Sequence, residues 1–285
     1  MNTNLWIAVI SAIICTASVV YIVAKRRNKN INKNEISKIK MLFKIFAVIL
    51  TTSLVFELAG IYITPNREKF YFNFTQENTD KMIALTFDDG PGPYTDELID
   101  GLEKLNAKAS FFLVGEKIKS YPDTVAKIAG KGHLVGNHTY SHIKLTALSP
   151  DEIKKEIDKT NEEIKAITGE APQFFRPPFG RYNSDTLNYV DMISVRWSKD
   201  TIDWKYEDEE KLYRYLIKNA GDGEIFLMHD VEKTTVKGVL RAIETLQKQG
   251  YKFVRADELL CRNGDGLLKG IGYRKCEKDK PPVHF

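Results

Sequence analysis

Short apolar runs alternate with longer amphipathic stretches between residues 81 and 260, and this alternation predicts the secondary structure. Seven runs have the length and boundaries of buried strands; they cover residues 82–87, 109–114, 133–135, 173–176, 193–197, 224–228 and 251–254. Apolar residues three or four apart predict helices at 95–106, 122–130, 150–168, 184–191, 208–219 and 236–249. The helix at 150–168 has the clearest ends, because Ser149 and Glu152 form a capping-box pattern and Gly169 suits the position after a last turn.

Strands that alternate with helices predict parallel strands joined by right-handed crossovers. We therefore expect an α/β fold, a distorted and incomplete TIM-like (β/α)7 barrel, over residues 81–260. In such barrels the active site lies at the carboxyl ends of the strands. Polar groups follow the predicted strands directly, at Asp88–Asp89, Arg176, Asp200–Asp203 and His229. These side chains are expected to converge at one end of the barrel.

Two longer apolar runs precede this body and predict membrane-spanning helices. The first span, residues 1–24, contains about 20 consecutive uncharged residues, which is enough to cross a bilayer. The second covers residues 41–63. Between them, residues 25–40 carry seven basic side chains and one acidic one, so the positive-inside rule places this loop in the cytoplasm. The chain is thus expected to be a two-helix protein of the cell membrane, in contact with the lipid bilayer, with an extracytoplasmic body.

An alternative reading starts translation at Met41, which would leave a single anchor or signal segment and would still export the body. Residues 64–80 are expected to form a stalk, and residues 261–285 form a C-terminal tail without an assigned role. The tail contains Cys261 and Cys276. An oxidising exterior permits a disulfide between them, but two cysteines alone do not establish one.

The charge distribution argues against a nucleic-acid partner. The whole chain has a formal net charge of +4, and the basic loop at residues 25–40 accounts for more than that surplus. The remaining body is close to neutral and slightly acidic, so it lacks the basic surface that binds phosphate backbones.

Two separated segments together indicate a metal-dependent hydrolytic site. Asp88 and Asp89 stand side by side after a strand, and His138 and His142 are four residues apart, a spacing at which one helical turn could point both imidazoles at one ion. Two imidazoles and one carboxylate leave metal positions open for water and substrate. The second carboxylate then remains available as a base. Such ligands suit Zn²⁺, and also Co²⁺, Ni²⁺ or Fe²⁺.

Residues 81–260 resemble the polysaccharide deacetylases of the NodB-homology type, carbohydrate esterase family four. Five motifs carry the resemblance in order: Thr86–Asp89, His138–His142, Arg176–Gly180, Asp200–Trp204 and Leu227–His229. The resemblance implies that Asp88 is the general base and that Asp89, His138 and His142 are the metal ligands. It also implies an N-acetylated glycan as the substrate.

The remaining motif residues have roles that chemistry suggests. Arg176 can hold Asp88 ionised and oriented. His229 suits the general acid, and Asp203 can keep it protonated. Backbone amides near Phe179, where the family often has tyrosine, can donate to an oxyanion. Trp204 and Leu227 are expected to form an apolar wall beside the acetyl group.

The sequence thus predicts a hydrolase that removes N-acetyl groups from a cell-surface glycan and releases acetate. Attachment to the membrane favours N-acetylglucosamine of cell-wall peptidoglycan as the substrate. Chitooligosaccharide or an exopolysaccharide are alternative substrates. A non-catalytic glycan-binding module is a more distant alternative, and it predicts the loss of a base, a ligand or the acid, none of which is missing here.

Overall fold

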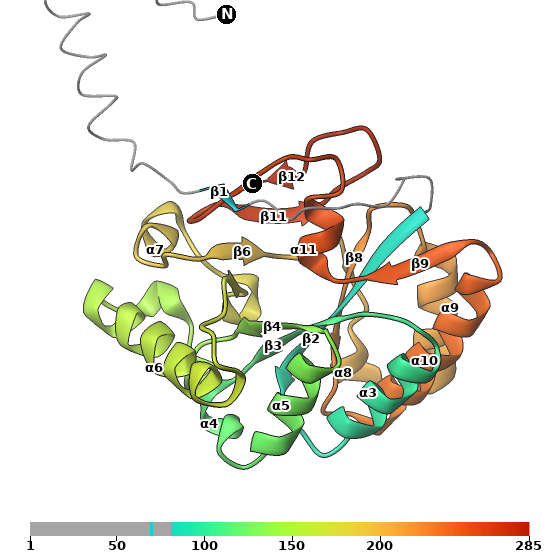
Figure 1. The fold of residues 1–285 in the computed structure, drawn as a ribbon, viewed down its shortest axis with the longest axis horizontal. Coiled ribbons are helices and arrows are strands. Elements are labelled where there is room, and N and C mark those ends of the chain that lie inside the picture. The colour runs from blue at the N-terminus through green and yellow to red at the C-terminus, as the bar shows by residue number, and fades with distance from the viewer. Residues whose placement is uncertain (1–68, 71–80, 285) are drawn as a thin grey trace, which may run out of the picture. The chain divides into compact units, whose positions relative to one another are not determined.

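The computed structural model describes residues 69–70 and 81–284 (Figure 1). These residues form a curled half-barrel of mostly parallel strands with helices packed outside it, in agreement with the expected α/β architecture. The seven predicted strands are all present, within a few residues of the expected bounds. The strands of the barrel are β2 (Lys81–Gly90), β3 (Ser110–Leu113), β4 (Leu134–Asn137), β5 (Phe174–Phe175), β6 (Ile193–Val195), β7 (Lys199–Asp200), β8 (Ile225–His229) and β9 (Tyr251–Val254).

The long strand β2 is the centre of the sheet. It pairs in parallel with β3 and with β8, and its first half also pairs with β9. Strands β4, β5 and β6 continue the sheet beyond β3, whereas β7 lies beyond β8. In the register of β2 and β8, Asp88 lies opposite His229. The two motifs are therefore brought together by backbone pairing alone.

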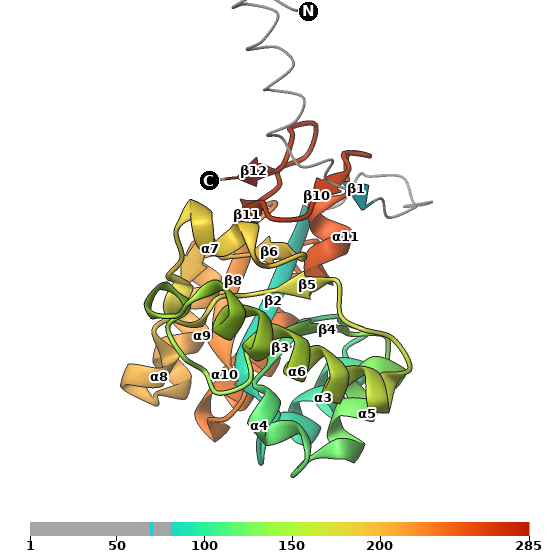
Figure 2. The same cartoon turned by 90° about the vertical axis from the view of Figure 1, so that its left-hand side faces the viewer.

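Helices surround the sheet. They are α3 (Thr95–Lys104), α4 (Gly115–Ile118), α5 (Pro122–Gly130), α6 (Pro150–Thr168), α7 (Ser184–Asn188), α8 (Asp203–Tyr206), α9 (Glu209–Asn219), α10 (Lys233–Gln247) and α11 (Ala256–Leu260). Most lie on the outer face of the sheet, whereas the last one, α11, packs on the opposite face, where Leu259 and Leu260 join Met82 and Ala84 of β2. Helices α9, α10, α3, α5 and α6 pack against one another in that order. Figure 2 shows α6 in front of the strands, and its contacts with β4 place it on that face.

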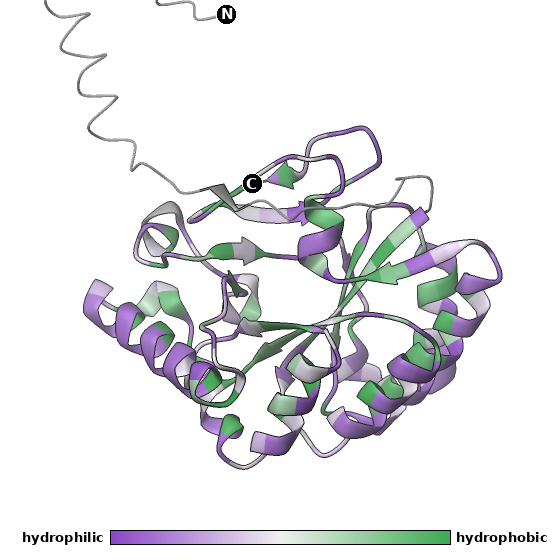
Figure 3. Ribbon diagram, viewed as in Figure 1, coloured by the Kyte–Doolittle hydropathy of each residue, from purple (hydrophilic) through white to green (hydrophobic). Residues whose placement is uncertain are grey.

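The helices turn apolar faces toward the strands (Figure 3). In α6, Ile153, Ile157 and Ile164 are buried on one face, as the predicted period requires. The expected capping box of Ser149 and Glu152 is formed, and Gly169 ends the helix with a φ of 86°. The largest core cluster lies between β2, β3 and β8 on one side and α3, α5, α9 and α10 on the other.

The C-terminal residues extend the sheet. Strand β11 (Gly272–Lys275) pairs in parallel with β6, and β12 (Val283–His284) pairs antiparallel with β11. Strand β10 (Leu267–Leu268) pairs with β1 (Lys69–Phe70), so the segments expected to be tail and stalk meet here. An isolated bridge between Glu224 and Lys275 links β11 back to the start of β8. Cys261 and Cys276 are both buried, and no disulfide joins the two.

The expected membrane segments at residues 1–24 and 41–63, and the basic loop at 25–40, lie outside the described residues. Within the described part of the chain, no helix has the length and apolar character to span a bilayer.

Candidate active site

A cleft of about 620 Å³ opens at the carboxyl ends of the strands. Every residue that the sequence singled out as a metal ligand, base, acid or pocket residue lines it, except Arg176 and Asp203, which lie directly behind its wall. The lining residues are Asp88, Asp89, His138, His142, Lys144, Phe179, Arg181, Trp197, Asp200, Trp204, Leu227 and His229.

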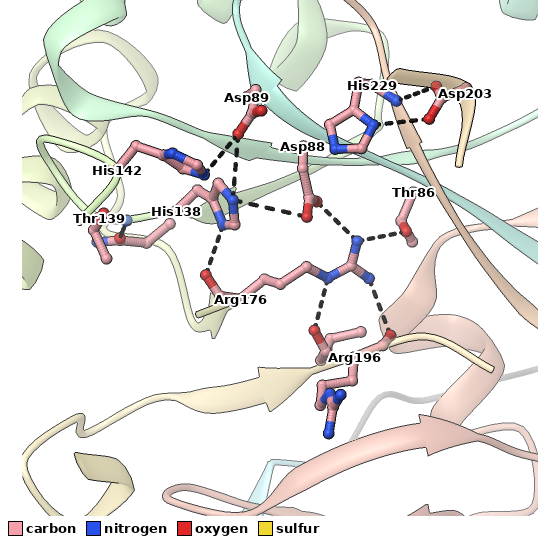
Figure 4. Close-up of polar contacts among 12 residues, drawn as sticks. Thr86, Asp88, Asp89, His138, Thr139, His142, Arg176, Arg196, Asp203 and His229 are labelled. Carbon is pink, nitrogen blue, oxygen red and sulfur yellow. Dashed lines mark hydrogen bonds and ion pairs between the residues drawn. The ribbon is translucent and has the colours of Figure 1, made fainter. Parts of the chain in front are cut away.

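Three side chains converge on a point that could hold a metal ion (Figure 4). Asp89 Oδ1 lies 3.1 Å from His142 Nε2 and 3.4 Å from His138 Nε2. Two ligand atoms held about 2.0–2.1 Å from one tetrahedral ion are separated by roughly 3.4 Å, so these spacings fit a single divalent metal ion. Burial would raise the pKa of the Asp89 carboxyl, but the facing imidazoles of His138 and His142 hold it well below its usual range.

The tautomer of His138 also fits a metal ligand. Its Nδ1 lies 2.7 Å from the carbonyl oxygen of Arg176, so Nδ1–H donates there, and the neutral tautomer with this bond has its lone pair on Nε2, the nitrogen that faces Asp89. Such a bond from the distal nitrogen orients metal-binding histidines. Asp89 Oδ1 is buried and has no hydrogen-bond partner among residues 81–284. An ion between these groups would satisfy it.

The expectation that one helical turn carries both histidines is wrong. His138 follows β4 on an irregular loop, in which Thr139 and His142 have positive φ values of 65° and 54°. Asn137 and Glu156 hold this loop in place. The Asn137 Oδ1 accepts from the Thr139 amide at 2.7 Å, and the Glu156 carboxylate accepts from the amides of residues 140 and 141 at 2.9 and 2.8 Å.

Arg176 is completely buried behind Asp88. Its guanidinium donates from Nη1 to Asp88 Oδ1 at 2.8 Å and to Thr86 Oγ1 at 2.7 Å. Nε and Nη2 donate to the carbonyls of Val195 and Arg196 at 2.8 and 3.0 Å. Burial lowers the pKa of Arg176, and the charge of Asp88 opposes that change. The planar guanidinium of Arg176 therefore holds Oδ1 of Asp88 in place. The other oxygen, Oδ2, faces the cleft and lies 3.8 Å from His138 Nε2.

His229 lies across Asp88 from His138 (Figure 4). Asp203, at the start of α8, accepts from the His229 amide and from its Nδ1, each at 2.8 Å, and Thr235 Oγ1 donates to Asp203 at 2.9 Å. Burial alone would lower the pKa of His229, but the hydrogen bond and charge of Asp203, aided by Asp88 and Asp89, raise it to about 9. The imidazole is thus held protonated at neutral pH, as a proton donor requires.

The opposite wall contains Phe179, whose ring lies 4.7 Å from that of His142 and whose backbone has a φ of 59°. The amides of residues 180 and 181 are bonded to Pro177 and Pro178, whereas the Phe179 amide has no backbone partner within the described residues. The Phe179 amide is therefore the backbone N–H of this turn that can donate a hydrogen bond to a ligand. Leu227 is buried at the floor, and Trp204 is 58% exposed at the rim.

Sequence reasoning missed several groups around the site. Lys144, Arg181 and Trp197 line the cleft without belonging to a recognised motif position. Among the described residues, eight non-glycine residues have positive φ; Asp89, His142 and Phe179 of these line the cleft, and Thr139 and Ile202 lie within two residues of lining positions in the sequence. Such backbone strain gathers at functional sites. A sequence pattern based on helix and strand periods carries no signal for it.

Comparison with known proteins places this geometry in a family. The family model for polysaccharide deacetylases matches residues 75–197. The solved structure "T48 deacetylase with substrate" has a TM-score of 0.67 and 36% identity, and covers 70% of this chain and 100% of its own. The chain belongs to the polysaccharide deacetylase family.

Two curated members of the family are similar over the same body. The peptidoglycan-N-acetylglucosamine deacetylase PgdA of Listeria monocytogenes is 39% identical over 68% of this chain and 41% of its own length. The peptidoglycan-N-acetylmuramic acid deacetylase PdaC of Bacillus subtilis is 37% identical over 65% of this chain and 40% of its own length. The chain thus spans about two fifths of the length of these relatives, which act on different sugars of one polymer.

Proposed function

We propose that this polysaccharide deacetylase hydrolyses the N-acetyl group of a peptidoglycan sugar and releases acetate. One observation carries the proposal: three side chains that could hold a metal ion, a buried carboxylate bound by Arg176 and a histidine hydrogen-bonded to Asp203 face one open cleft. A non-catalytic glycan-binding module would have no need to keep all three. The two curated relatives support peptidoglycan as the polymer.

Asp89, His138 and His142 would hold one divalent ion, most suitably Zn²⁺, with Co²⁺, Ni²⁺ and Fe²⁺ as other candidates. When bound, the ion supplies Lewis-acid polarisation of the acetamide carbonyl and acidifies water. Asp88, oriented by the Arg176 guanidinium, takes the proton of the attacking water through Oδ2. The Phe179 amide donates to the carbonyl oxygen as negative charge develops on it.

His229 completes the reaction from the other side of Asp88. Its Nδ1 is engaged by Asp203, so Nε2 is the nitrogen that donates a proton to the leaving amine. Without that proton the tetrahedral intermediate would expel hydroxide and return to the substrate, because hydroxide leaves more easily than an amide anion. Trp204 and Leu227 form apolar wall and floor for the acetyl methyl group.

We also propose that the protein is anchored in the cell membrane. The apolar runs at residues 1–24 and 41–63 flank a strongly basic loop, which supports a membrane anchor with the deacetylase body outside the cytoplasm. Such an anchor would keep the cleft near the cell-wall polymer.

The test uses the full-length protein, purified in detergent and loaded with Zn²⁺. After incubation with purified peptidoglycan, the glycan is cut with a muramidase and the fragments are analysed by mass spectrometry. The proposal predicts fragments that lack one acetyl group with the wild type, and none with Asp89→Ala. Unchanged fragments with the wild type on peptidoglycan, together with deacetylation of chitooligosaccharide, would move the substrate to another glycan.

A further inference from the structure

Two cations on the rim of the cleft have no acidic partner in the part of the chain that the structure describes. Lys144 and Arg181 both line the cleft and are exposed. Neither forms an ion pair with a carboxylate among the side chains that the structure describes; the contact of Lys144 is with the Phe179 ring, whose centroid lies 5.5 Å from Nζ. Other charged side chains near the cleft already form ion pairs: Arg176 pairs with Asp88, and His229 pairs with Asp203.

The topology puts these two cations on one side of the cleft. Lys144 belongs to the loop after β4 and Arg181 to the turn after β5, and β4 and β5 are neighbours in the sheet. Asp200, the cleft carboxylate outside the base and metal positions, is the last residue of β7, at the other end of the sheet order. Its Oδ1 accepts from the Ile202 amide at 3.0 Å. The rim is therefore positive beside Phe179 and negative beyond His229.

We propose that Lys144 and Arg181 form an anion subsite that binds a carboxylate carried by the glycan close to the scissile acetamide. The proposal rests on the proposed function and specifies its substrate further. In N-acetylmuramic acid, a lactyl ether on the carbon next to the acetamido carbon supplies such a carboxylate. With the acetamide between the metal-binding triad and Phe179, a group on that neighbouring carbon comes within reach of the rim beside Phe179.

The carboxylate can come from the sugar that loses its acetyl group or from the adjacent sugar of an alternating chain. Both sources offer the same charge to Lys144 and Arg181. A neutral N-acetylglucosamine polymer offers none, so the subsite makes the enzyme prefer a bare glycan strand with free lactyl groups over chitooligosaccharide.

The experiment compares three short oligosaccharides of equal length with the zinc-loaded full-length protein. The first alternates N-acetylglucosamine with N-acetylmuramic acid and carries no peptide. The second is identical except that each lactyl carboxylate is converted to a neutral methylamide. The third is a chitooligosaccharide. The variants are Lys144→Gln, Arg181→Gln, the double variant, and Lys237→Gln, which removes an exposed cation of α10 outside the cleft.

We expect the wild type to have a kcat/KM on the acidic substrate roughly three- to tenfold above that on its methylamide, because exposed charge-assisted contacts are individually modest. The difference should come from KM, shrink in about 0.5 M salt, fall in each single variant and vanish in the double variant. Rates on the methylamide should not change, and Lys237→Gln should behave as wild type. Mass spectrometry of the product identifies which sugar was deacetylated, and so which source supplies the carboxylate.

Equal wild-type rates on the acidic substrate and its methylamide would overturn the subsite while leaving the deacetylase intact. An equal loss on both substrates in the double variant would also overturn it, because the side chains would then serve something other than charge recognition. No acetate from any of the three oligosaccharides would instead contradict the proposed function itself.

Discussion

The buried pair of Arg176 and Asp88 should make a single substitution unusually costly for stability. Arg176→Met keeps most of the volume of the side chain but removes its four hydrogen bonds, to Asp88, Thr86 and two backbone carbonyls. Asp88 is only 4% exposed, so its carboxylate would lose its cation inside the protein. Removing one partner of a buried pair costs about 3–5 kcal/mol.

For a domain of this size, that loss corresponds to a fall in Tm of roughly 6–20 °C. Thermal unfolding followed by near-UV circular dichroism measures it. Arg214→Met is the matched control, since Arg214 is exposed and pairs with Glu210 on the surface of α9, and its Tm should stay close to that of the wild type.

A second variant separates the charge from the packing. If the unpaired carboxylate is the main cost, then Asp88→Asn added to Arg176→Met should restore part of the lost stability, because the amide is neutral. A Tm within about 2 °C of the wild type for Arg176→Met, or a double variant even less stable than the single one, would refute this reasoning.

Three further predictions follow from the site. The pKa of His229 is about 9 in the folded protein, against 6.5 for the free side chain. Its protonation therefore stabilises the fold fully below pH 6.5, and this contribution disappears as the pH rises through 9. Asp203→Asn removes the partner that raises this pKa, so it should shift the alkaline limb of a pH–rate profile to lower pH. His142→Ala should weaken zinc binding at least tenfold in calorimetry, with a Tm that no longer rises on adding zinc. Gly90→Ala should lower activity and Tm, because its Cβ would lie 2.7 Å from Asp230 Oδ1; unchanged values would show that the turn after Asp89 can relax.

The strands and helices could be predicted because each has an apolar face that repeats along the sequence. The period of α6 and the run of β2 are examples, and the register of β2 with β8 then brings Asp88 and His229 together. The loop of His138 and His142 could not be predicted this way. Its shape depends on positive φ values and on Asn137 and Glu156, and these contacts leave no periodic pattern.

The C-terminal segment shows a different limit. Strand β11 is four residues long and half polar, so nothing in its sequence distinguishes it from a loop. Its place beside β6 is fixed by tertiary packing, with Tyr273 and Cys276 in the same apolar cluster as Ile193. The shared position of Lys144 and Arg181 could not be predicted from the sequence either, because the two side chains come together only where the loops after β4 and β5 border one cleft.

The most direct test of the central claim is acetate release from purified peptidoglycan by the full-length protein. The wild type is measured after removal of metal with a chelator and again after zinc is restored, and Asp88→Asn is measured with zinc. The account predicts release only by the zinc-restored wild type, since the triad needs its ion and the water needs its base. Equal release by Asp88→Asn, or release that persists without metal, would contradict it.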